Sequence, residues 1–496
     1  MNNTNKKLTI NALSAIIQVT FTAILYFFLY KYLIYHLGVK LLGVWSLILS
    51  FSSIANLANM GLTSGLVKFV AEYLAEKKYD KIGKLILTSL LSLAILFSVF
   101  SLVILFGAKF FLHFVIDKEF LTAAFSILPW SLASLCVNAC SGVFTSVLEG
   151  YQKNYLRNFL YIFSGIVMFF VTILLTPAYQ TQGVAIAQFM QAIFILFVSL
   201  ILIIQINSYN RISNWKWSTK SFKELFDYGY KFQAVSICQL LYEPTTKMLL
   251  SKFGGLALLG HYEMATRLVN QFRSLLVNAN QVVIPVIAET VKTKSKAYLQ
   301  DFYANMNRIM SLFTFTLSTL LIVLTPFVSL IWIGNINHDF TFAVYILTIS
   351  SIFNIMSGPA YFSCMGSGHL NILVLMHILM AILNLVIGYL LGQLLGGYGI
   401  IISWGIAQSV GSIVLSVSFN KQIAIGYKEI FTKNEKWIIL LSIFIILISI
   451  LTFSTSLPLM NNYLRTLLCC LLLLLYIPIV LRNENFKKIL LNFRKK

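Results

Sequence analysis

The chain has 496 residues, of which 58% are hydrophobic and only 11% are charged, and its mean hydropathy is +0.84. Because soluble domains carry about 25% charged residues, this composition excludes an ordinary soluble protein and indicates one that lies in a lipid bilayer. The formal net charge of +21 would suit a nucleic-acid partner. However, the basic residues form short clusters between apolar runs and no continuous basic face, so we expect no nucleic acid as a partner.

Apolar runs long enough to cross a bilayer, about 20 residues each, recur along the whole chain. The basic residues 1–7 precede an apolar run over 8–35, which is too long for the core of a signal peptide. We therefore interpret this run as a first membrane helix that is retained. The fourteen predicted spans are 9–33, 41–66, 84–107, 121–147, 157–177, 181–206, 226–252, 256–288, 302–333, 341–364, 370–395, 399–419, 436–456 and 462–481.

The basic residues predict the orientation of these spans. With fourteen spans, 27 of the 37 Lys and Arg residues lie in the connections or span ends on one side of the membrane, and only seven lie in those on the other side. Since basic connections mark the cytoplasmic side, we expect both termini in the cytoplasm. All connections are short, which leaves little room for a catalytic domain and predicts a transporter, not an enzyme.

Short motifs recur at a nearly constant spacing of 216 or 217 residues. The four pairs are 42–45 with 259–262, 71–72 with 288–289, Gly150 with Gly366, and 183–184 with 399–400. An even number of predicted helices lies between the members of each pair, so the repeats have the same orientation in the membrane. The fold expected is all-α, with two pseudo-symmetric six-helix bundles (residues 1–206 and 226–420), a cytoplasmic linker (207–225) and two further helices with a basic tail (436–496).

Polar side chains form stripes on predicted spans near the start of each half. At 100° per residue, one face of the span 256–288 carries Glu263, Arg267 and further polar residues along its whole length. Each charge inside a membrane costs about 2.5–3.5 kcal/mol, so these stripes predict a central cavity. The candidate substrate-binding residues are Lys247, Arg267, Arg273, Arg308, Asn270, Ser274, Asn278, Gln18 and Ser50.

Two interpretations of the charged residues remain open. Glu243 with Lys247, and Glu263 with Arg267, are pairs at the i,i+4 spacing that neutralises charge along a helix and has a purely structural use. Alternatively, these residues line the cavity, whose net positive charge favours an anionic ligand that arginine binds with its two-pronged guanidinium. The six cysteines lie in apolar runs without metal-ligand spacing, so we expect packing roles for them and no metal site.

Several motifs resemble those of polysaccharide-biosynthesis flippases in the multidrug/oligosaccharidyl-lipid/polysaccharide (MOP) exporter superfamily, and among them the O-antigen (Wzx-type) branch. These motifs are YHLG at 35–38, LGVWSL at 42–47, NMGL at 59–62, FVAE at 69–72, LEGYQK at 148–153, RN at 157–158, LGHYEMA at 259–265, and Pro285. The resemblance covers about residues 8–420 and implies the fold of the MATE multidrug exporters with two added helices.

This resemblance also implies a function. A flippase of this kind moves an undecaprenyl-pyrophosphate-linked oligosaccharide, an O-antigen or capsule repeat unit, across the bacterial inner membrane by alternating access. The cationic residues would hold the pyrophosphate or acidic sugars, Glu243 and Glu263 would couple transport to H⁺ or Na⁺, and the last two helices would hold the polyprenyl tail. A polysaccharide polymerase and a chain-length regulator are the protein partners that it implies, with no other cofactor.

Two other functions remain as alternatives. A multidrug or cation antiporter of the same superfamily would have twelve helices and an acidic cavity, whereas fourteen spans and a positive cavity are predicted here. A membrane glycan polymerase or ligase would need a large outer loop with catalytic groups. The longest polar connection, around residues 207–224, is predicted on the cytoplasmic side.

Overall fold

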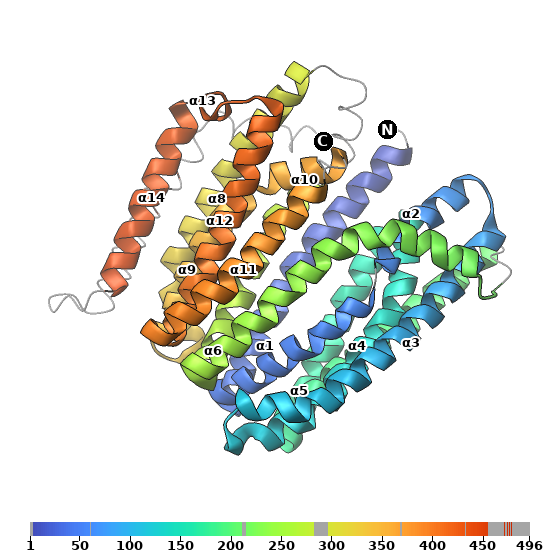
Figure 1. Ribbon diagram of the computed structural model, residues 1–496, viewed down its shortest axis with the longest axis horizontal. Helices are drawn as coiled ribbons and strands as arrows, with labels where there is room; N and C mark the ends of the chain where they lie inside the picture. Colours follow the sequence, from blue (N-terminus) through green and yellow to red (C-terminus); the bar gives the residue numbers. More distant parts are fainter. Residues whose placement is uncertain are drawn as a thin grey trace. The chain divides into compact units, whose positions relative to one another are not determined.

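A computed structural model describes residues 3–59, 61–210, 215–281, 296–367, 370–431 and 433–454, together with residues 471, 474, 476 and 478. Throughout these residues the regular secondary structure is helical, without a β-strand (Figure 1). This confirms the all-α class. Nine helices in the described part of the chain are long and apolar enough to cross a membrane.

The chain divides into two compact units, Met1–Gly260 and His261–Lys496. The N-terminal unit contains α1 (Asn3–Ser53), η1 (Ile54–Asn59), α2 (Leu62–Ala75), α3 (Tyr79–Phe111), η2 (Leu112–Phe114), η3 (Lys118–Phe120), α4 (Leu121–Gly150), α5 (Asn154–Asn210) and the first part of α6 (Thr219–Gln281). The C-terminal unit contains the rest of α6, α8 (Lys296–Ile333), α9 (His338–Met356), α10 (Gly358–Ser367), α11 (Leu370–Leu395), α12 (Gly397–Ile423), α13 (Tyr427–Ile430) and α14 (Lys433–Ser454). The predicted domain limits, with a linker over 207–225, remain a prediction.

Three of these helices contain a sharp break in the backbone. The breaks lie at Gly38 in α1 (φ 73°), Gln180 in α5 (φ 48°) and Gly255 in α6 (φ 75°). Each break falls in the connection between two predicted spans, so each long helix comprises two predicted spans joined by a tight turn. The nine candidate spans of the described residues count the pairs in α1 and α5 once each and do not include α6, so the total of fourteen remains a prediction.

The backbone breaks repeat at the same spacing as the sequence motifs. Gly38 (φ 73°, ψ 169°) and Gly255 (φ 75°, ψ 171°) have nearly identical dihedral angles and are 217 positions apart. Gln180 (φ 48°, ψ −130°) and Gly396 (φ 61°, ψ −144°) form a second such pair, 216 positions apart. Glycine adopts a positive φ without steric cost, which explains its use at three of the four breaks. The predicted pseudo-symmetry is thus present in the backbone as well as in the sequence.

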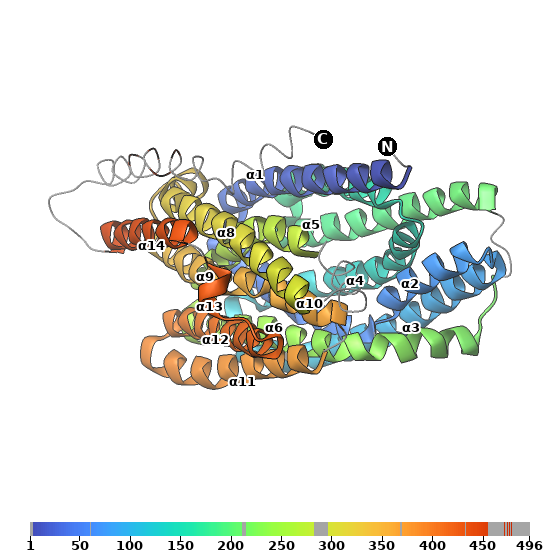
Figure 2. The same ribbon diagram turned by 90° about the horizontal axis from the view of Figure 1, so that it is seen from above.

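Each unit has its own apolar core. In the N-terminal unit, α4 packs against α2, α3 and α5 around fully buried residues such as Leu66, Leu85 and Val147 (Figure 1). In the C-terminal unit, α8 packs between α9 and α14 (Figure 2). The outward faces are also apolar, with Leu174 74% and Leu394 77% exposed. Such faces suit contact with lipid, where apolar surface carries no penalty.

Candidate functional site

An ion pair of the C-terminal unit joins Glu263 and Arg267, one turn apart on α6. The Nε atom of Arg267 lies 2.7 Å from Oε1 of Glu263. The acid is almost completely buried, at 1% exposed, whereas the side chain of Arg267 is 35% exposed. The pair therefore anchors a buried carboxylate and presents a guanidinium.

A second i,i+4 ion pair on α6, which lies in the N-terminal unit, has the opposite arrangement. Nζ of Lys247 lies 3.1 Å from Oε1 of Glu243, but here the base is 3% exposed and the acid 60% exposed. This pair presents a carboxylate and buries an ammonium group. Of the four residues in these two ion pairs, Arg267 and Glu243 are thus the accessible ones.

Arg273 belongs to a polar network that joins three helices of the C-terminal unit. Its Nε atom donates to Oδ1 of Asn354 in α9 at 2.8 Å, and Nδ2 of Asn354 donates to Oγ of Ser412 in α12 at 3.5 Å. A parallel contact between α9 and α12 runs from Oγ of Ser350 to Oε1 of Gln408 at 2.9 Å. The structure therefore places Arg273 among groups of α9 and α12 that the sequence analysis did not select.

A signal for this network exists in the sequence. Ser350 and Asn354 of α9 and Ser357 at its C-cap follow one another at helical spacing, and α4 carries the same three residue types 216 positions earlier, at Ser134, Asn138 and Ser141. The last serine of each set donates to the backbone carbonyl of its asparagine, at 2.8 Å for Ser357 and 2.9 Å for Ser141. The repeat thus carries a second polar stripe in each half.

Arg308 has the contacts of a structural residue. Its Nε and one terminal nitrogen donate to the backbone carbonyls of Ile430, at 2.8 Å, and Glu429, at 2.6 Å. The other terminal nitrogen donates to Oδ1 of Asn305 at 3.2 Å. These contacts bind the carbonyl end of the short helix α13, where a cation is favourable. Its predicted role in substrate binding finds no support in these contacts.

The remaining predicted residues are dispersed. Oγ of Ser50 and Oγ of Ser274 each donate to a carbonyl of their own helix, of Leu47 at 2.8 Å and of Gln271 at 2.9 Å. Asn270 is exposed on α6, and the side chain of Asn278 lies outside the described residues. Gln18 lines a separate cavity of the N-terminal unit, which is described below.

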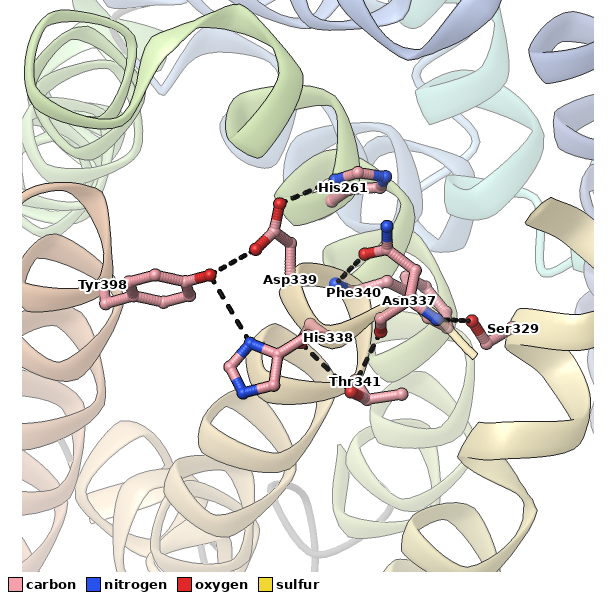
Figure 3. A network of polar contacts seen from close by, with 8 residues as sticks. All are labelled: His261, Ser329, Asn337, His338, Asp339, Phe340, Thr341 and Tyr398. Carbon is pink, nitrogen blue, oxygen red and sulfur yellow. Dashed lines mark hydrogen bonds and ion pairs between the residues drawn. The ribbon is translucent and has the colours of Figure 1, made fainter. Parts of the chain in front are cut away.

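A second network, absent from the sequence analysis, surrounds Asp339 at the start of α9 (Figure 3). Its Oδ2 atom lies 3.5 Å from Nδ1 of His261 in α6, and its Oδ1 atom accepts a hydrogen bond from the hydroxyl of Tyr398 in α12. The same hydroxyl lies 3.4 Å from Nδ1 of His338. Asp339 therefore connects three helices of the C-terminal unit through one carboxylate.

The start of α9 is fixed by a conventional cap. Oδ1 of Asn337 accepts from the backbone N–H of Phe340 at 3.0 Å, and Oγ of Ser329 accepts from the N–H of Asn337 at 2.9 Å (Figure 3). Asn followed by Asp in the first turn is a recognisable signal for a helix start. Within the described residues, no group of three or more His, Cys, Asp or Glu side chains is arranged to hold a metal ion.

Comparisons with solved structures give the same fold. A MATE family multidrug resistance transporter of the MOP superfamily, in an inward-facing conformation, matches with a TM-score of 0.71 at 16% identity, covering 83% of this chain and 98% of its own. The lipid II flippase MurJ, in an inward closed conformation, matches with a TM-score of 0.71 at 16% identity, covering 97% of this chain and 99% of its own. A MOP superfamily transporter from Pyrococcus furiosus matches at 0.64 and 15% identity, covering 84% and 96%. At these identities the likeness concerns the fold.

The family is shown by the sequence itself. The model of a family described as "polysaccharide biosynthesis protein" matches residues 36–340, which is more than half of the chain. No curated protein matches this sequence. The matched region includes three of the four backbone breaks, those at Gly38, Gln180 and Gly255. It also includes both ion pairs of α6. The chain therefore belongs to the polysaccharide biosynthesis protein family and has the membrane-transporter fold of the MOP superfamily.

Proposed function

We propose that this protein is a flippase that moves an undecaprenyl-pyrophosphate-linked oligosaccharide from the cytoplasmic to the outer leaflet of a bacterial inner membrane by alternating access. The oligosaccharide would be an O-antigen or capsule repeat unit, passed on to a polymerase and its chain-length regulator. The membership in a polysaccharide biosynthesis family supports a glycan substrate. The likeness to a lipid II flippase, which covers nearly all of both chains, supports a lipid-linked one.

The observation that carries this proposal is the partly exposed guanidinium of Arg267, paired with the buried carboxylate of Glu263. A carboxylate at 1% exposure fixes the position of the arginine, and the 35% exposure of the arginine leaves it accessible to a ligand. A guanidinium binds two phosphate oxygens at once, which suits a pyrophosphate. Its cost within the membrane is offset by the paired acid.

The C-terminal unit also offers space for an apolar chain. A cavity of about 540 Å³ is lined mostly by apolar side chains of α8, α9, α12 and α14. The apolar members include Phe315, Ile352, Phe353, Ile413, Ile439 and Leu440. Helix α14 belongs to the C-terminal addition that distinguishes the predicted fourteen-span arrangement from a twelve-helix one. This supports a place for the polyprenyl tail beside α14.

For coupling to H⁺ or Na⁺, the exposures of the two acids favour Glu243. Its carboxylate is 60% exposed and can receive a cation, whereas the carboxylate of Glu263 is buried against Arg267. A multidrug antiporter is the second candidate function, because a MATE family transporter matches with the same TM-score as the flippase. It requires an acidic binding site, and Glu243 is the accessible acid of the two pairs.

The experiment is a complementation test in cells from which the gene has been removed. We expect the lipid-linked oligosaccharide to accumulate in the cytoplasmic leaflet and the surface polysaccharide to be lost. Wild-type protein should restore both, Arg267→Ala should restore less than a tenth of the polymer at equal protein level, and Arg267→Lys should restore it in part. Normal polysaccharide in the deletion strain, combined with increased sensitivity to cationic drugs, would instead support the antiporter.

A further inference from the structure

The N-terminal unit contains a cavity that neither ion pair borders. It has a volume of about 200 Å³ and lies between α1 and α5. Its lining residues are Gln18, Thr22, Leu25, Tyr26, Leu29, Tyr161, Ser164, Gly165, Met168, Phe169 and Gln191. The lining therefore combines amides, hydroxyls and aromatic rings, and it includes no acidic or basic side chain.

One wall of the cavity is preorganised. Oγ of Ser164 donates to the carbonyl of Tyr161 at 3.0 Å, and Nε2 of Gln191 donates to Oγ of Ser164 at 3.4 Å. Ser164 is completely buried, so this chain of bonds holds the amide of Gln191 in place. The carbonyl oxygen of that amide is left as an acceptor beside the cavity.

The opposite wall holds polar groups without such bonds. Gln18 and Thr22 border the cavity in the middle of a predicted span, and both side chains are half-buried. Among the described residues, neither side chain has a hydrogen bond to another part of the chain. The amide and the hydroxyl are therefore available to a ligand in the cavity.

The fold does not demand polar residues at these positions. The internal repeat relates Gln18 to Val235 at a spacing of 217, and it relates Ser164 to Met380 and Gln191 to Ala407 at a spacing of 216. These three equivalent positions are apolar, whereas Thr22 and Tyr161 correspond to Gln239 and His377. Since the other half builds the same helix geometry with apolar residues at the three positions, packing alone does not account for Gln18, Ser164 and Gln191.

The chemistry of the lining selects one class of ligand. A charged group would find no counter-ion in this cavity, and an apolar group would leave the amide of Gln18 unpaired. A neutral ring with several hydroxyls satisfies both donors and acceptors, and its C–H face packs against aromatic rings such as those of Tyr26, Tyr161 and Phe169. Because pockets for drug-sized ligands measure about 300–1,000 Å³, a cavity of 200 Å³ admits a single ring.

We infer that this cavity is a binding site for one neutral sugar residue, a hexose or an N-acetylhexosamine. The inference rests on the proposed function, since it assigns one sugar of the transported oligosaccharide to the N-terminal unit. Recognition here is separate from the charged group at Arg267, which binds the phosphate. A sugar that lacks the hydroxyl or acetamido group facing Gln18 would bind less tightly.

The test uses the purified full-length protein in nanodiscs and saturation-transfer NMR with four methyl glycosides: those of glucose, galactose, N-acetylglucosamine and glucuronic acid. At least one neutral glycoside should give a signal, and the glucuronide should give none. Gln18→Leu and Gln191→Leu should each reduce that signal at least fivefold. Gly165→Leu should abolish it by filling the cavity, because a Cβ at Gly165 already lies 3.1 Å from Cδ1 of Leu25.

The matched control is Gln205→Leu, the same chemical change on an exposed position further along α5, which should leave the signal unchanged. The melting temperature of each variant shows whether it is folded. If Gly165→Leu fails to fold, the two glutamine variants still test whether the cavity binds the sugar. The inference is overturned if no neutral glycoside binds, or if binding is unchanged in both glutamine variants. This outcome is independent of the complementation test, since a flippase can fail to bind sugars here and a sugar-binding transporter can fail to flip lipid.

Discussion

Gly43 and Gly260, which are 217 positions apart, meet at a reciprocal close contact in the N-terminal unit. A Cβ at Gly43 would overlap the carbonyl oxygen of Leu256, and a Cβ at Gly260 would overlap that of Val39. Val39 and Leu256 are themselves 217 positions apart. The contact is therefore pseudo-symmetric, and it requires glycine at both positions because the approaching groups are backbone atoms that cannot move aside.

This contact gives the first prediction, which concerns stability. Gly43→Ala and Gly260→Ala should each destabilise the protein by about 1–3 kcal/mol, the usual cost of forcing extra atoms into a packed interior. The measurement is the midpoint of thermal unfolding in detergent. Gly107→Ala is the control, since a Cβ at Gly107 has open space around it, and equal midpoints for all three variants would contradict the close approach.

The second prediction concerns Glu243 and Lys247. Glu243→Gln removes a carboxylate partner of the buried ammonium group of Lys247 and should lower the unfolding midpoint. Adding Lys247→Met should recover the midpoint, because breaking a buried pair costs more than replacing it. Glu243→Gln should also remove the response of the flipping rate to imposed proton or sodium gradients. Glu76→Gln, an exposed acid before α3, serves as the control and should keep that response.

The third prediction concerns the network around Asp339. Asp339→Ala removes contacts to both His261 and Tyr398, so it should destabilise the protein more than Tyr398→Phe does (Figure 3). Because Asp339 and Tyr398 are in direct contact, a double-mutant cycle should give a coupling energy of about 0.5–3 kcal/mol. Tyr35→Phe, at an 84% exposed tyrosine, should have no coupling to Asp339. If the effects of Asp339→Ala and Tyr398→Phe on stability are additive, the carboxylate of Asp339 does not stabilise the position of Tyr398 in α12.

Much of the fold is predictable from the sequence, because spans and turns are local features. The apolar runs predicted separate spans on either side of Gly38, Gln180 and Gly255, and the backbone breaks at these residues. The repeat spacing predicted the pseudo-symmetry that Gly396 completes. Neither result needs knowledge of which helices are neighbours.

The candidate site is harder to predict from the sequence, because it depends on contacts between distant residues. The i,i+4 spacing places Glu263 beside Arg267, but it does not indicate which of the two side chains is buried. The acid is buried in this pair, whereas the base is buried in the pair of Glu243 and Lys247. The sequence also gives no sign that Arg308 donates to backbone carbonyls of residues 429 and 430, more than 120 positions away. Helical periodicity fixes a stripe on one helix and gives no information about the helix that faces it.

The pair of Glu263 and Arg267 gives the fourth prediction, and it separates a structural from a functional use of the charges. Arg267→Gln leaves the buried carboxylate of Glu263 without this partner and should destabilise the protein by about 3–5 kcal/mol. The double variant Glu263→Gln/Arg267→Gln replaces the ion pair by two neutral amides. It should recover most of the lost stability.

The decisive measurement is the rate at which this double variant flips a lipid-linked oligosaccharide in proteoliposomes, at matched protein level and unfolding midpoint. If Arg267 binds the pyrophosphate, the rate should fall at least tenfold although the protein is stable. If the double variant flips at the wild-type rate, the pair only neutralises charge along α6, and the assignment of Arg267 as the phosphate-binding group is wrong.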